Sequence, residues 1–129
     1  MTQLSKAKKI VRDFYAALDV ANGSDVAHVM RKYCADDYAW RGFHPFGEMT
    51  DPAEVADTFW APLKSALHPM QRRMDAFFGG QNEMDGFAST WVVSMGHLMG
   101  LMDEPWLGLP TTGKIAMLRY CEFHRVDRD

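Results

Sequence analysis

The spacing of apolar residues changes once along the chain, and this change most constrains the fold. In the first third, apolar residues recur at spacings of three and four, as on one face of an amphipathic helix. After Pro69 the pattern becomes that of extended strands. Helices followed by long antiparallel strands are typical of the α+β class. We therefore predict one domain over residues 1–129, with helices on one face of a curved, mostly antiparallel sheet.

Local signals place the helices. The first carries an apolar face at Leu4, Ala7, Val11, Phe14 and Leu18. An Asn-Gly pair at 22–23 ends it, and Ser24 can cap a short second helix. Asp51 can cap a third helix, because Pro52 suits the first helical position. Pro62 should kink or split that helix, since proline has no backbone N–H.

The second half predicts three strands. They are expected over residues 72–78, within the apolar run 87–101, and over residues 114–126. An earlier aromatic segment, residues 38–47, predicts a short strand that runs into a loop. Residues 103–113 contain two prolines and two glycines, which indicate a loop between the last two strands.

Charge and cysteine content narrow the class of protein. Fourteen basic and 17 acidic residues give a net charge of −3, which argues against a nucleic-acid-binding surface. No apolar run reaches the roughly 18 residues of a membrane span, and the N-terminal residues lack a signal-peptide pattern. We expect the two cysteines, Cys34 and Cys121, to be reduced thiols in a cytoplasmic protein.

Two ionisable residues stand out on otherwise apolar strand faces. Alternation in the last strand places Glu122 on one face with Leu118, Tyr120 and His124. Alternation in the long strand places His97 on a face with Trp91, Val93, Met95 and Met99. If these two faces meet inside a cone-shaped sheet, Glu122 and His97 look into one apolar cavity.

A carboxylate in such a cavity could act as a general base. Burial favours its neutral form and brings its pKa toward the working pH. A nearby imidazole could orient a carbonyl or donate a proton to the developing oxyanion. Proton abstraction next to a carbonyl then requires no metal and no cofactor.

Structural roles compete with these functional ones. Glu122 could pair with Arg119 or Arg125, and His97 could be a hydrogen-bonded core histidine. Tyr120 and Trp91 could belong to the core, and His44 could be a loop residue. Glu122 and His124 lack a convincing third metal ligand. The nucleotide-binding patterns GxGxxG and GxxxxGK[ST] and the hydrolase pattern GxSxG are absent from the sequence.

Three segments resemble the SnoaL-like polyketide cyclase (ester cyclase) family of the nuclear transport factor 2-like superfamily. They are residues 95–100 (MGHLMG), 108–114 (GLPTTGK) and 119–126 (RYCEFHRV). The family pattern has a Gly-x-His strand, a Pro-x-Thr-Gly loop and a strand with an acid three residues before an arginine. The resemblance covers nearly the whole chain, and the 108–114 loop with the following strand is its most specific part.

The resemblance implies a cone-shaped α+β barrel whose sheet wraps around the N-terminal helices. Glu122 matches the family's acid–base carboxylate, usually an aspartate, and His97 matches a pocket histidine. Family members of this kind close rings by an intramolecular aldol step. The loop before Gly108 is longer than the family's, so Trp106 could form a lid. Tyr120, Trp91, Trp40, His44 and Trp106 are the expected substrate-binding residues.

The sequence thus predicts a small-molecule enzyme that removes a proton next to a carbonyl in an apolar substrate, without metal or cofactor. The alternatives are a non-catalytic ligand-binding module and a dimerisation domain of the same fold. The family usually continues through a turn into one more strand, whereas this sequence ends at Asp129. Either the chain is a fragment of a longer protein or a partner subunit completes the sheet, and an exposed edge strand would favour association. We expect a homodimer.

Overall fold

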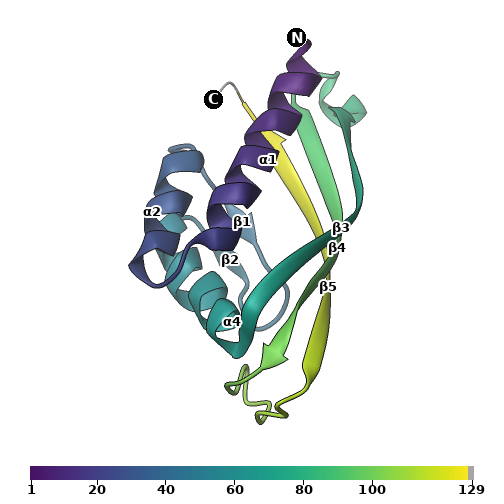
Figure 1. The fold of residues 1–129 in the computed structure, drawn as a ribbon. Helices are drawn as coiled ribbons and strands as arrows, with labels where there is room; N and C mark the ends of the chain where they lie inside the picture. The colour runs from purple at the N-terminus through teal and green to yellow at the C-terminus, as the bar shows by residue number, and fades with distance from the viewer. Residues whose placement is uncertain (128–129) are drawn as a thin grey trace.

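The computed structural model describes residues 1–127, in which the helical segments precede the long strands, as predicted (Figure 1). The first half contains α1 (Gln3–Val20), α2 (Ser24–Tyr33), the hairpin β1 (Trp40–Arg41) and β2 (Glu48–Met49), and the helical stretch α3 (Pro52–Val55), η1 (Ala56–Trp60) and α4 (Ala61–Ala66). The second half contains β3 (Leu67–Gln81), the 3₁₀ turn η2 (Glu83–Asp85), β4 (Thr90–Met102) and β5 (Ile115–Val126).

The third helix starts as predicted but does not break at its proline. The Asp51 side chain accepts a hydrogen bond from the Ala53 N–H at 3.0 Å and caps α3. The segment η1 is a π-helix, in which the Ala61 N–H reaches the Ala56 carbonyl. Because this wider turn comes just before Pro62, the missing N–H is accommodated without a break between α3 and α4.

The three long strands form one antiparallel sheet in the order β3-β4-β5. β3 is longer than the predicted 72–78, and its pairing with β4 shifts register between His68 and Gln71 and between Met74 and Ala76. Within residues 1–127 the sheet does not close, because β3 and β5 each keep one edge without a partner strand. The result is the α+β architecture predicted from the sequence, with an open sheet.

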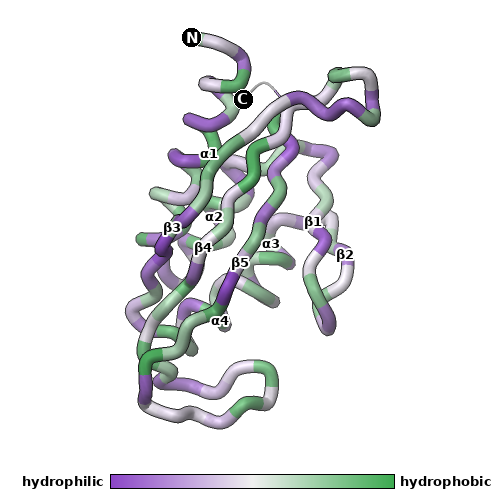
Figure 2. Tube along the Cα trace, turned by 90° about the vertical axis from the view of Figure 1, so that its right-hand side faces the viewer, coloured by the Kyte–Doolittle hydropathy of each residue, from purple (hydrophilic) through white to green (hydrophobic). Residues whose placement is uncertain are grey.

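The helices cover only one face of this sheet, here called the inner face (Figure 1). The residues of β4 and β5 that point to the helices are even-numbered, from Val92 to Met102 and from Ala116 to Val126. One part of the core joins α1 to Val92 and Val126, and a larger part joins the other helices to Leu98, Met102 and Tyr120. The opposite, outer face carries the odd-numbered residues of both strands and is seen toward the viewer in Figure 2.

Two local features fix how the layers meet. Gly96 lies where β3 passes close to β4, and a Cβ placed there would be 1.9 Å from the Arg73 carbonyl oxygen. Lys64 of α4 is buried, and its Nζ donates to the carbonyls of Leu18 (2.6 Å) and Asp19 (3.0 Å) near the end of α1. Burial lowers the pKa of this ammonium group. The two hydrogen bonds of Lys64 therefore connect α4 to the C-terminal end of α1.

Candidate functional site

Glu122 lies on the inner face of β5, where three side chains surround its carboxylate. The Arg72 Nη1 donates to Oε1 at 3.0 Å, and the Tyr15 hydroxyl donates to the same oxygen at 3.2 Å. The His124 Nε2 lies 3.8 Å from the other oxygen, Oε2. Among residues 1–127, no hydrogen-bond donor reaches Oε2. One carboxylate oxygen is therefore anchored, and the other is left for a further partner.

Arg72 links this carboxylate to α1. Its side chain is only 5% exposed, and its guanidinium donates to both carboxylate oxygens of Asp19 at 3.1–3.3 Å. It also stacks 3.7 Å over the Tyr15 ring. Burial opposes the positive charge, but Glu122 and Asp19 outweigh it and raise the pKa of Arg72. We call Tyr15, Asp19, Arg72, Glu122 and His124 the inner polar cluster.

Tyr15 and His124 are both uncharged near neutral pH. Burial, followed by the charge of Glu122, raises the pKa of the Tyr15 hydroxyl well above its usual range. Burial lowers the pKa of His124, although the charge of Glu122 opposes this shift. The Tyr15 oxygen and His124 Nε2 are 2.8 Å apart, so the hydroxyl lies between an imidazole and a carboxylate. The cluster thus has a neutral imidazole next to the carboxylate.

The lowered pKa of His124 predicts a loss of stability in mild acid. The unfolded chain takes up the proton below about pH 6.5 while the folded chain resists it, so unfolding becomes easier as the pH falls from 6.5 toward the folded pKa. Tyr15, Glu122 and Arg72 face the ring. The slope should approach about 1.4 kcal/mol per pH unit. Urea unfolding between pH 8 and pH 5 measures the free energy of unfolding at each pH. This free energy should depend less on pH in His124→Asn than in the unsubstituted chain.

His28→Asn provides the matched control, because this exposed histidine lies on α2, outside the cluster. This variant should keep the pH dependence of the unsubstituted chain. An unchanged dependence in His124→Asn would contradict the assignment of the proton to His124.

A second polar pair lies deeper under the cluster. The hydroxyls of Ser94 and Tyr120 are 2.9 Å apart, and both residues are buried. The Tyr120 ring also lies 4.9 Å from the Arg72 guanidinium. Tyr120 is therefore on the same face as Glu122, as predicted, and it supports the guanidinium.

His97 does not join Glu122, and the expectation of a shared cavity was wrong. Glu122 pairs with Ser94, and both point to the inner face. His97 is three positions from Ser94, so alternation sends it to the outer face. There its Nδ1 lies 3.4 Å from Asp75, between Arg73 and Arg119 of the neighbouring strands.

Four other expected substrate-binding residues are not part of the inner polar cluster. Trp91 is on the outer face, where its indole N–H donates to Ser89 at 2.8 Å. His44 is exposed in the β1–β2 turn. Trp40 and Trp106 pack in an aromatic group with Phe46 and Phe59. Trp106 therefore joins the β4–β5 loop to the hairpin.

Sequence reasoning missed three members of the cluster: Tyr15, Asp19 and Arg72. Its candidate partners for Glu122 were Arg119 and Arg125, which point to the outer face. Strand alternation could have excluded both, because they are an odd number of positions from Glu122. Nothing local identifies Arg72, since its position beside Glu122 depends on the irregular pairing of β3.

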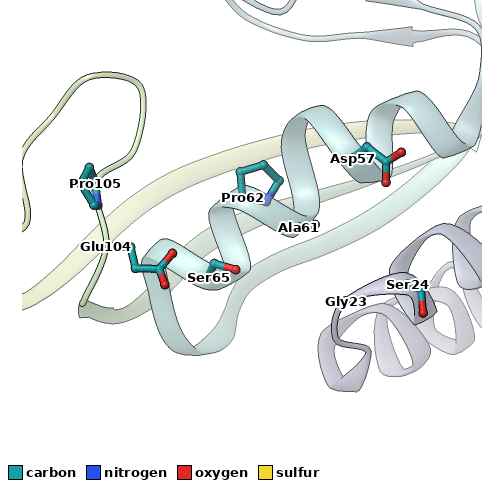
Figure 3. Close-up of a pocket in the computed structure, with 8 residues that line it drawn as sticks. All are labelled: Gly23, Ser24, Asp57, Ala61, Pro62, Ser65, Glu104 and Pro105. Carbon is teal, nitrogen blue, oxygen red and sulfur yellow. The ribbon is translucent and has the colours of Figure 1, made fainter.

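Two adjoining clefts lie on the helical side, away from the inner polar cluster. The larger, of about 420 Å³, runs between α4, the start of α2 and the loop after β4 (Figure 3). It is lined by Gly23, Ser24, Asp57, Ala61, Pro62, Ser65, Glu104 and Pro105. The smaller, of about 320 Å³, adds Lys64 and His68 to part of this lining. Glu122 lines neither cleft.

Residues 1–127 contain no group of three side chains suited to hold a metal ion. None of the helices in this part of the chain has the length and apolar character that a membrane crossing requires.

Comparison with known proteins identifies the fold. No family model and no curated protein matches the chain. The chain is similar to the crystal structure of a "putative SnoaL-like polyketide cyclase" from Jannaschia Sp. CCS1, with a TM-score of 0.71 and 19% sequence identity. The match covers 98% of this chain and 81% of the other. This chain therefore has the SnoaL-like α+β fold that the sequence resemblance predicted.

Proposed function

We propose that the protein is a small-molecule acid–base enzyme that uses Glu122 to remove a proton next to a carbonyl group. The observation that supports this most is the asymmetry of the carboxylate. Arg72 and Tyr15 both hold Oε1, while Oε2 has no hydrogen-bond donor among the described residues and faces a neutral imidazole. The side chains of Glu122 and His124 are 21% and 20% exposed, so solvent reaches this part of the cluster.

In the proposed step, Oε2 takes the acidic proton and the substrate becomes an enolate. The breaking C–H bond leaves its electron pair on the substrate, and the carboxylate becomes a carboxylic acid. The enolate oxygen needs a hydrogen-bond donor. The candidate is the N–H of the neutral His124, because Tyr15 already donates its single hydroxyl proton to Oε1. The substrate class is an apolar ketone or keto-ester.

Glu122→Gln should abolish this proton transfer. Exchange of the proton next to the carbonyl can be followed by NMR in D₂O over a panel of cyclic keto-esters. The unsubstituted chain should accelerate exchange over buffer, and the variant should lose at least about 100-fold of that acceleration, a typical contribution of general-base catalysis. Glutamine retains an oxygen that can accept from Arg72 and Tyr15, so circular dichroism should show a folded variant.

Glu83→Gln is the matched control, because this glutamate lies on η2 and outside the cluster. Glu83→Gln should accelerate exchange of the substrate proton as much as the unsubstituted chain does. Full exchange activity in folded Glu122→Gln would refute the role of Glu122 as the base, and no acceleration by the unsubstituted chain would refute the enzyme proposal.

The second candidate is a non-catalytic ligand-binding or assembly domain. The Arg72 ion pair favours it, because Oε1 of Glu122 is bound to a buried guanidinium, as in a purely structural ion pair. This candidate predicts ligand-induced NMR shifts without proton exchange, and affinities that Glu122→Gln leaves unchanged. We also propose a cytoplasmic location, on the basis of the free thiols of Cys34 and Cys121.

A further inference from the structure

The turn between α1 and α2 contains an asparagine followed by a glycine, at Asn22 and Gly23. Figure 3 shows Gly23 where the chain enters α2, across the larger cleft from α4. Both residues are exposed, and neither belongs to the core or to the inner polar cluster. The backbone nitrogen of the residue after an asparagine can attack the asparagine carboxamide. Glycine hinders this attack least, because it has no side chain.

The nitrogen that would attack is free in the folded chain. Among residues 1–127, the Gly23 N–H donates to no hydrogen-bond acceptor. The carbonyl of the same peptide group, that of Asn22, accepts the Asp25 N–H at 3.1 Å. This bond and the positive end of α2 stabilise the negative charge that spreads over the peptide group when its N–H loses a proton. The fold therefore favours the nucleophilic form of the Gly23 nitrogen.

The carboxamide of Asn22 is only weakly bound. Its Nδ2 donates to the Val20 carbonyl at 3.4 Å, beyond the usual range of about 2.7–3.2 Å. The space around the turn is also open, because a Cβ built on Gly23 would meet no atom within 4 Å. The carboxamide is therefore free to rotate toward the Gly23 nitrogen.

Asn82, the other asparagine of the chain, is protected by its neighbour and by its own side-chain bond. Glu83 follows it, so a side chain hinders the attack and a negative charge opposes the loss of a proton from the peptide group. The Asn82 Oδ1 accepts the Met84 N–H at 3.0 Å, which caps η2 and fixes the carboxamide. Asn82 is therefore an internal reference for the reactivity of Asn22.

We propose that Asn22 is a site of spontaneous deamidation through a cyclic imide formed with Gly23. The Gly23 N–H gives its proton to hydroxide from the solvent, and the nitrogen forms a bond to Cγ of Asn22. The Cγ–Nδ2 bond then breaks, and the carboxamide nitrogen takes a proton from water and leaves as ammonia. Water opens the ring at either carbonyl and gives aspartate or isoaspartate. Water is the only co-reactant, and nothing is oxidised or reduced.

The modification changes the charge of the smaller cleft. Asn22 lines this cleft together with Lys64 and His68, so either product places a carboxylate among basic side chains at the positive end of α2. Aspartate leaves the path of the main chain unchanged, whereas isoaspartate adds one atom to it between α1 and α2. This inference is independent of the proposed function, because the reaction uses no residue of the inner polar cluster.

Peptide mapping by mass spectrometry tests the proposal on the full folded chain, incubated at mildly alkaline pH. Each conversion adds about 1 Da, and peptides with aspartate and isoaspartate separate on chromatography. We expect Asn22 to convert at least about 10-fold faster than Asn82 and to give both products. Gly23→Ala should slow the conversion of Asn22 at least about 10-fold, because the added methyl group hinders the attack.

Two further variants control for effects on folding. Gly47→Ala is the matched control, since Gly47 also has a positive φ (67°, against 56° for Gly23) and no atom within 4 Å of an added Cβ. It should leave the conversion of Asn22 unchanged. Asn22→Gln keeps Gly23 and a carboxamide but would require a larger ring, so it should show no conversion at this position over the same period.

Several results would overturn the proposal. They are equal rates at Asn22 and Asn82, aspartate as the sole product, which indicates direct hydrolysis, and undiminished conversion in Gly23→Ala or Asn22→Gln. The same reaction in urea separates the effect of the fold from that of the Asn-Gly sequence. Conversion of Asn22 more than about 100-fold faster in urea than in the folded chain would show that the fold protects this turn, contrary to the proposal.

Discussion

Replacement of Arg72 by alanine is expected to lower the free energy of unfolding by about 3 kcal/mol. The guanidinium is 5% exposed and is the ion-pair partner of Glu122 and Asp19. Its removal leaves two negative side chains close together with only partial access to water, since they are 21% and 24% exposed. This access keeps the expected loss at the lower end of the range for a broken buried ion pair. Urea unfolding at pH 7 measures it.

The control for this variant is Arg41→Ala. Arg41 also pairs with a glutamate, Glu48, but its side chain is 76% exposed, so its loss should cost less than about 1 kcal/mol. Combining Arg72→Ala with Glu122→Gln should recover part of the lost stability, because one of the two unpaired charges is gone. A loss below about 1 kcal/mol for Arg72→Ala would show that the ion pairs contribute no more than surface pairs do.

Gly96→Ala should also destabilise the fold strongly, by about 3 kcal/mol. The added Cβ would lie 1.9 Å from the backbone oxygen of Arg73, and no side-chain rotation can relieve a contact with backbone. β3 would have to move away from β4 and carry the adjacent Arg72 with it. The midpoint temperature of thermal unfolding and the midpoint urea concentration should therefore both fall.

The same strand pair offers a matched control in Gly80→Ala. A Cβ at Gly80 has no atom within 4 Å, so the same substitution should change stability by no more than about 0.5 kcal/mol. Equal stability of the two variants would contradict the close approach of β3 to β4 at Gly96.

The order of elements could be predicted from the sequence because local patterns determine it. Helical spacing, the Asp51 cap and the strand periodicity all indicated elements that the structure contains. Alternation in β5 also correctly grouped Tyr120, Glu122 and His124 on one face. These inferences need only neighbouring residues, which explains their success.

The orientation of β4 could not be predicted in this way. Both of its faces are rich in apolar residues, and the outer one, with Trp91, Met95 and Met99, looks more like a core than the inner one with Ser94 and Gly96. The inner face uses small residues there because the Tyr120 hydroxyl lies against Ser94 and the backbone of β3 lies against Gly96. This is a property of packing between distant segments, and hydrophobicity along one strand does not reveal it.

The bond between Tyr15 and Glu122 joins residues that are 107 positions apart. During synthesis from the N-terminus, α1 is complete long before β5 exists. The polar side chains of α1 therefore cannot form their contacts with β5 until the end of synthesis. Contacts of this sequence separation are slow to form, because a long loop must close first. The inner polar cluster should therefore be among the last parts of the molecule to assemble, and a truncation of β5 before Glu122 would leave Arg72 without one of its two carboxylate partners.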